Sequence, residues 1–87
     1  MPIISVFFGI VIKMYYRDHN PPHFHAEYQG FEAFFDIQNG KIILGEFPPK
    51  AQKIIKEWVE EHQEELNKNW KLSKQNQPLF KIPGADQ

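Results

Sequence analysis

The hydrophobic pattern of this chain changes its period once, at Pro48-Pro49. Before this pair, apolar residues alternate with polar ones in short runs, which is typical of half-buried β-strands. After it, they recur at the three- and four-residue spacing of an amphipathic helix. Because proline has no backbone N–H, the pair ends a strand and fits the first turn of a helix. The chain is therefore expected to fold as a sheet followed by a helix.

Turn signals divide the first part into about four strands. Asn39-Gly40 is the strongest signal, because a two-residue type I′ turn needs positive φ at both positions. Gln29-Gly30 marks another tight turn, Pro21-Pro22 interrupts the ladder, and Gly9 predicts a bulge or break within the first strand. The expected strands lie at about residues 3–17, 23–28, 31–37 and 41–47.

The second part predicts one long helix at about residues 49–73. Its apolar positions form a continuous stripe that can pack on one face of the sheet. They are Ala51, Ile54, Ile55, Trp58, Val59, His62, Leu66 and Trp70. Pro78 ends the helix at the latest, and the tail at residues 78–87 is apolar enough to dock on the core. The expected fold class is α+β, an antiparallel meander of about four strands packed against one long C-terminal helix in two layers.

Length and composition limit the functions that such a fold can carry. The 87 residues are expected to form a single domain, residues 1–87, with a small core. The absence of cysteine excludes disulfides and thiolate chemistry. A formal net charge of −1 gives no sign of nucleic-acid or membrane binding. The N-terminal apolar run is too short to span a membrane and does not resemble a signal peptide, so a cytoplasmic protein is expected.

Turn lengths also predict which residues pair between strands. A two-residue turn at Gln29-Gly30 places apolar residues opposite one another on one face, as a buried face requires. The pairs are Tyr28 with Phe31, Ala26 with Ala33, and Phe24 with Phe35, and the same face continues with Ile37, Ile42 and Leu44. This face is expected to receive the helix stripe.

The opposite face gathers the histidines of the stretch YYRDHNPPHFHAEY, residues 15–28. His23 and His25 point the same way because they alternate along one strand. Asp36 is expected across from His23, and Phe34 across from His25. A five-residue loop at residues 18–22 gives the pairs on the other side, which are Arg17 with His23, Tyr15 with His25, and Lys13 with Glu27.

Two stretches of the chain resemble a known family. They are GIVIKMYYRDHNPPHFHAEYQGFEA, residues 9–33, and GEFPPKAQKIIKEWVEEHQEELNKNW, residues 45–70. The D-H-x-P-P-H-F-H-A core in the first and the W-x-x-x-H-x-x-E-L helix in the second resemble the small bacterial and archaeal family catalogued as domain of unknown function 4160. The resemblance implies a meander-plus-helix domain and a gene placed beside a second small uncharacterised domain, as in toxin–antitoxin pairs. It implies no catalytic residue.

One hypothesis for the histidine face is acid–base chemistry on RNA. Two imidazoles titrate near neutrality and can exchange protons with a 2′-hydroxyl without a cofactor. Arg17 would stabilise the charge of the phosphorane, Asp36 would orient His23, and Tyr15 could donate a hydrogen bond. The alternative is a solvated sheet face on which these residues form ordinary cross-strand pairs.

A second hypothesis is a small metal site. The pair of histidines in H-x-H on a strand can aim at one point, and His19 or Glu27 could supply a third ligand beside His23 and His25. Three protein ligands and an open position are typical of catalytic zinc sites, so a zinc-like divalent ion is the expected cofactor under this hypothesis. His62, on the helix stripe, is expected to be a hydrogen-bonded core residue instead.

A third hypothesis concerns a protein partner. Phe34, Ile43 and Phe47 are expected on the histidine face, which the helix does not cover, and could form an interaction patch. A homodimer or the neighbouring gene product would bury them, or the C-terminal tail could fold back over them instead. Together with the family resemblance, which implies the pairing, the prediction is one component of a toxin–antitoxin-like pair with a histidine face that cleaves or binds RNA. The alternatives are a non-catalytic protein-binding module and a small metal-binding domain.

Overall fold

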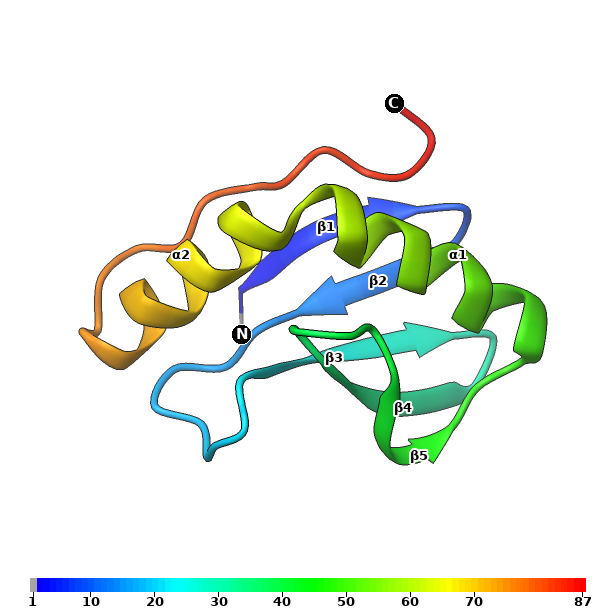
Figure 1. Cartoon of the computed structure of the whole chain (residues 1–87), viewed down its shortest axis with the longest axis horizontal. Coiled ribbons are helices and arrows are strands. Elements are labelled where there is room, and N and C mark those ends of the chain that lie inside the picture. The colour runs from blue at the N-terminus through cyan, green and yellow to red at the C-terminus, as the bar shows by residue number, and fades with distance from the viewer. Residues whose placement is uncertain (1) are drawn as a thin grey trace.

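The computed structural model, which describes residues 2–87, contains one antiparallel sheet whose strands follow one another in chain order. The strands are β1 (Ile3–Phe7), β2 (Ile10–Lys13), β3 (His23–Tyr28), β4 (Phe31–Asp36) and β5 (Ile42–Glu46). Two helices, α1 (Pro49–Glu61) and α2 (Gln63–Lys74), run one after the other across the sheet (Figure 1). The predicted α+β class is confirmed.

The number of elements differs from the prediction in two places. The first strand is interrupted by a complete hairpin turn, because Phe8 and Gly9 both have positive φ, 51° and 78°. This gives five strands in place of four. The single helix is divided at His62, whose φ of −120° and ψ of 29° are not helical. The interruption is short, since the Leu66 N–H still donates to the His62 carbonyl at 2.9 Å.

The register between β3 and β4 is the predicted one. His23 pairs with Asp36, His25 with Phe34, and the apolar pairs lie on the other face. The register between β2 and β3 was predicted wrongly by two residues: Lys13 pairs with His25, and Val11 pairs with Glu27. The error arises because β2 ends at Lys13 and residues 14–22 form a loop. A shift of two residues leaves every side chain on its predicted face.

Strand β5 carries an extra residue that changes which side chains are exposed. Phe34 pairs with Leu44 but Phe35 pairs with Ile42, so Ile43 is a bulge. Leu44 was expected in the core and is instead 61% exposed on the histidine face. Phe47 was expected in the exposed patch and is instead buried, with its ring 5.3 Å from that of Phe35.

The helix stripe packs on the predicted apolar face of the sheet. Trp58 of α1 is fully buried, and its ring lies 5.0 Å from that of Phe7 and 5.7 Å from that of Phe24. Phe24 stacks on Phe35 in the cross-strand pair at 5.6 Å. Burying aromatic side chains of this size supplies much of the driving force for folding in a small domain. The helices therefore pack on the face of the sheet opposite to the one that carries His23 and His25.

The C-terminal segment, residues 75–87, returns past the helices and lies along β1 (Figure 1). The Ile82 N–H donates to the Ile4 carbonyl at 2.8 Å, and Asn69 of α2 bonds both backbone groups of Phe80. The indole N–H of Trp58 donates to the Pro83 carbonyl at 2.8 Å. These contacts cover the β1 edge of the sheet. Within residues 2–87, no helix is long and apolar enough to cross a membrane.

Candidate functional site

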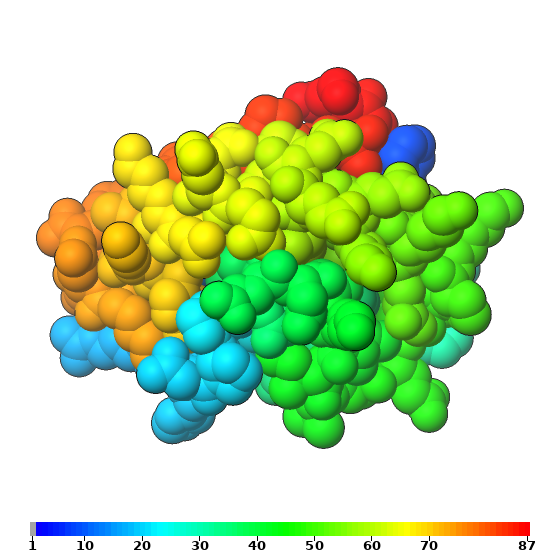
Figure 2. Space-filling view, in the orientation of Figure 1, coloured from blue at the N-terminus to red at the C-terminus, as the bar shows by residue number. Residues whose placement is uncertain are grey.

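The loop between β2 and β3 is held against the end of α2. The Arg17 N–H donates to the Ser73 carbonyl at 3.3 Å, and Lys74 Nζ donates to the Asp18 carbonyl. Figure 2 shows this light-blue loop between orange α2 and the green segment that contains β5. At the other end of the loop, the Ile37 N–H donates to the Pro22 carbonyl at 3.1 Å. The loop is therefore fixed at both ends beside the histidines of β3.

Asp18 in this loop meets two imidazoles at a single oxygen. Its Oδ2 atom lies 3.0 Å from His23 Nε2 and 3.0 Å from His25 Nε2. Its Oδ1 atom accepts a hydrogen bond from the His19 N–H at 2.9 Å. The side chains of His23 and His25 are only 7% and 12% exposed, and that of Asp18 is 21% exposed. A carboxylate and two imidazoles thus converge at a largely buried position.

His23, as a neutral imidazole, is the member of this cluster whose hydrogen bonding is incomplete. Its Nδ1 atom lies 2.7 Å from the Pro21 carbonyl oxygen, which can only accept, so Nδ1 carries the proton. In neutral His23, Nε2 then presents a lone pair toward Asp18 Oδ2. Among residues 2–87, no group makes a hydrogen bond to this buried nitrogen. An orphaned buried acceptor costs about 1–3 kcal/mol, so its retention points to a ligand.

Aromatic rings hold both imidazoles in place. Phe34 stacks on His23 at 5.4 Å between ring centroids and packs against His25 at 4.1 Å. Tyr15 meets His25 edge-on at 4.2 Å, and Trp70 of α2 lies 5.5 Å from His23. This packing limits ring rotation and keeps the two Nε2 atoms aimed at Asp18 Oδ2.

The Asp18 carboxyl has a pKa below its ordinary value of 3.8. Partial burial acts in the opposite direction and would raise this pKa. The hydrogen bond with His25, the hydrogen bond from the His19 N–H and the electrostatic interactions with His23 and His25 together outweigh the burial. Asp18 therefore stays ionised and available as an anionic ligand over the physiological range.

The comparison with protein families matches this region. The model of the family described as Domain of unknown function (DUF4160) covers residues 9–71. The chain belongs to this family. No curated protein and no solved structure matched the chain. The matched part of the DUF4160 domain contains the whole Asp18–His23–His25 cluster, so the chemistry of the cluster has to be inferred from its own geometry.

The DUF4160 fold brings together some of the residues predicted for the site and separates others. Tyr15 lies against His25, as its predicted face requires. Asp36 lies opposite His23 in register, but its carboxylate accepts from the Gln38 N–H at 2.7 Å. Arg17 is exposed and occupies the turn before Asp18 with a φ of 54°. The carboxylate next to the imidazoles is thus Asp18, for which the sequence pattern predicted no role.

The predicted alternative metal ligands lie outside the cluster. His19 is exposed, and its backbone rather than its ring contacts Asp18. Glu27 forms an ion pair with Lys13 at 2.9 Å. His62 lies on the helix side, with its Nδ1 atom bonded to Glu65 and its ring 5.7 Å from that of Trp58.

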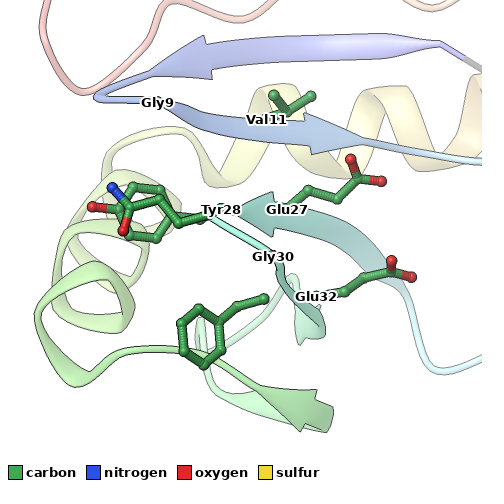
Figure 3. Close-up of a pocket in the computed structure, with 8 residues that line it drawn as sticks. Gly9, Val11, Glu27, Tyr28, Gly30 and Glu32 are labelled. Atoms are coloured by element: carbon green, nitrogen blue, oxygen red, sulfur yellow. The ribbon is translucent and has the colours of Figure 1, made fainter.

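A row of glutamates borders the histidine face. Glu27 pairs with Glu32, and Glu32 pairs with Glu46, across three neighbouring strands. Figure 3 shows the side chains of Glu27 and Glu32 next to each other beside Val11 and Gly30. Like charges in direct cross-strand pairs repel one another. Lys13 offsets part of this negative charge through its ion pair with Glu27.

Proposed function

We propose that Asp18, His23 and His25 bind one divalent transition-metal ion, for which zinc is the reference. Metal–ligand bonds of about 2.0–2.1 Å place neighbouring ligand atoms roughly 2.9 Å apart in octahedral and 3.3 Å apart in tetrahedral geometry. The two separations of 3.0 Å between Asp18 Oδ2 and the imidazole nitrogens lie in this range. All three donor atoms lie within 4.8 Å of one another.

The orphaned Nε2 atom of His23 is the observation that carries the proposal. A metal ion would accept the lone pair that no hydrogen of residues 2–87 reaches. The bond from Nδ1 to the Pro21 carbonyl is the arrangement that fixes the tautomer of a ligating histidine and raises its basicity. The same bond has no such role if His23 is an ordinary buried residue.

The donor set has a consequence for the kind of metal site. Two imidazoles and one carboxylate supply three protein ligands, whereas structural zinc sites are closed by four. The remaining position can take water or another ligand, and a bound ion supplies Lewis acidity there. Asp18 provides the negative charge, while His23 and His25, held by Phe34, provide the fixed geometry.

Metal-free acid–base chemistry on RNA, within a toxin–antitoxin-like pair, is the competing function. The hydrogen bond between His25 Nε2 and Asp18 Oδ2 favours it, because a carboxylate that orients an imidazole is a common acid–base device. The glutamate row Glu27, Glu32 and Glu46 does not, since it would repel the phosphates of RNA approaching this face. Metal binding explains more of the geometry.

Calorimetric titration of the untagged, chelator-treated protein with zinc tests the proposal. We expect one zinc ion per chain, and a loss of affinity of more than about a hundredfold in His25→Gln. His19→Gln is the matched control, because His19 is exposed and its ring contacts none of the three ligands. Absence of binding, or equal weakening in both variants, would contradict the proposal.

An RNA-cleavage assay separates the two functions. The competing function predicts cleavage that persists in excess chelator and disappears in His25→Gln. Metal binding predicts that chelator removes any activity of the site, and that Asp18→Asn removes both the activity and the bound zinc. Cleavage in chelator by a variant that no longer binds zinc would favour the acid–base function.

A further inference from the structure

A surface pocket of about 290 Å³ opens beside the proposed metal site. Asp18 and His23 line it together with the apolar side chains of Phe34, Ile43 and Leu44. This volume is at the lower end of the range for pockets that bind small molecules. Apolar walls with a few convergent polar groups are the usual composition of such pockets. The pocket therefore joins two proposed metal ligands to an apolar surface.

The apolar wall is built by an irregular feature of β5. The bulge at Ile43 turns Leu44 to the histidine face, where it pairs with Phe34. Ile43 and Leu44 are 43% and 61% exposed, although both are large and apolar. Phe34 stacks on His23 and His25, so the wall begins directly at the imidazole rings. Exposed apolar side chains that adjoin a polar cluster mark a binding surface.

The charge of the site selects the polar part of the ligand. A divalent ion on Asp18 and two neutral imidazoles has a net charge of +1, so its open position favours an anionic oxygen donor. Extended polyanions would meet the row formed by Glu27, Glu32 and Glu46 on the same face. A small ligand with a single carboxylate is different. When that carboxylate is bound to the ion, the ligand is too short to reach the glutamate row and has only one negative charge for the row to repel. The apolar wall then selects what is attached to the carboxylate.

We propose that this pocket binds a small organic acid. The carboxylate of the acid completes the coordination of the metal ion, and its apolar body lies against Phe34, Ile43 and Leu44. This inference rests on the proposed metal-binding function. The C-terminal carboxylate of a peptide with an apolar last residue has the same chemistry and is a second source of the ligand.

Visible absorption of the cobalt(II)-loaded protein reports directly on the open coordination position. We expect acetate and hexanoate each to change the spectrum. Each methylene buried on the wall strengthens binding about two- to fourfold, so hexanoate should bind at least about tenfold more tightly than acetate. Leu44→Ser should reduce this difference without changing the affinity for cobalt, because Leu44 is not one of the three proposed metal ligands. Val6→Ser, at a 53% exposed apolar residue of β1, should change none of these values.

The outcomes separate the failure of this inference from that of the metal site. If cobalt does not bind, the metal-binding function itself is wrong. If cobalt binds but the acids leave its spectrum unchanged, or acetate and hexanoate bind equally, the organic-acid proposal alone is overturned. Tighter binding of N-acetyl-Gly-Gly-Phe than of 3-phenylpropanoate supports the shared chemistry and assigns the ligand to a peptide terminus. The reverse order assigns it to a free acid.

Discussion

Asp18→Asn should stabilise the metal-free protein at high pH, although it removes a residue of the proposed site. In neutral His23 the buried Nε2 lone pair faces an Asp18 oxygen at 3.0 Å and has no donor within residues 2–87. An asparagine amide has the same shape. Its Oδ1 atom can keep the bond from the His19 N–H, now 2.9 Å, while its NH₂ group donates to both imidazole lone pairs.

The expected change in the free energy of unfolding follows from the hydrogen bonds that Asp18→Asn adds and replaces. A hydrogen bond to a buried orphan acceptor adds about 1–3 kcal/mol to the free energy of unfolding. Part of this gain is lost because the charged acceptor of the His25 hydrogen bond is replaced by a neutral group. A net gain of about 1 kcal/mol raises Tm by roughly 4–8 °C in a domain of this size.

Urea unfolding followed by tryptophan fluorescence, in chelator at pH 8.5, measures the change in the free energy of unfolding. Glu57→Gln removes one negative charge from an exposed position on α1 and controls for the change in net charge. An Asp18→Asn variant that is less stable than the wild type would show that His23 Nε2 is not an orphan acceptor. The observation that carries the metal-binding proposal would then be lost.

Three further predictions concern the carboxylate and the scaffold. Because the folded pKa of Asp18 is lowered, its ionised form adds stability above the ordinary pKa of 3.8, and this stability is lost as pH falls through the folded value. In acid unfolding below pH 4, the wild type should therefore lose stability relative to Asp18→Asn, which has no such carboxyl group. Gly45→Ala should cost more than the roughly 1–3 kcal/mol of a strained φ, because its Cβ would lie 2.4 Å from the Glu32 carbonyl, whereas Gly30→Ala, at φ +84° in open space, should cost only the strain in the same urea titration. Asn69→Ala should lower the free energy of unfolding by about 2–3 kcal/mol, because both hydrogen bonds to the Phe80 backbone disappear. It should also speed hydrogen exchange of the Ile82 amide. Unchanged exchange would show that Asn69 does not hold the tail.

The parts of the fold that the sequence predicted are those set by local pattern. The two-residue turn at Gln29-Gly30, with both φ values positive, leaves little freedom in the β3–β4 register. The change to helical spacing after Pro48 likewise identified which face of the helix packs on the sheet. Both patterns act over a few residues, so a single chain displays them completely.

The parts that the sequence did not predict depend on contacts between distant segments. The loop from Met14 to Pro22 allows several β2–β3 registers, and its path is fixed by Ser73 and Lys74 at the end of α2. No local pattern reports that contact, and without it Asp18 is only one more polar residue before a Pro-Pro turn. The one available signal was a carboxylate in the same short motif as the two histidines.

The bulge in β5 likewise made the predicted exposure wrong at two positions. Strict alternation from Ile42 places Leu44 in the core and Phe47 outside, and one extra residue at Ile43 reverses both. Gly45, with a φ of 96°, is the residue that could have indicated an irregular strand. Its lack of a side chain permits the close approach to Ala33, where a Cβ would lie 2.9 Å from the neighbouring Cα.

Nitrogen NMR of the histidine rings, recorded before and after addition of one equivalent of zinc, tests the metal centre most directly. The chain has four histidines, so each ring can be assigned. We predict that the Nε2 signals of His23 and His25 move to the position of a metal-bound nitrogen, while those of His19 and His62 stay in place. Unchanged signals for His23 and His25, or equal shifts for all four rings, would contradict a metal ion held by Asp18, His23 and His25.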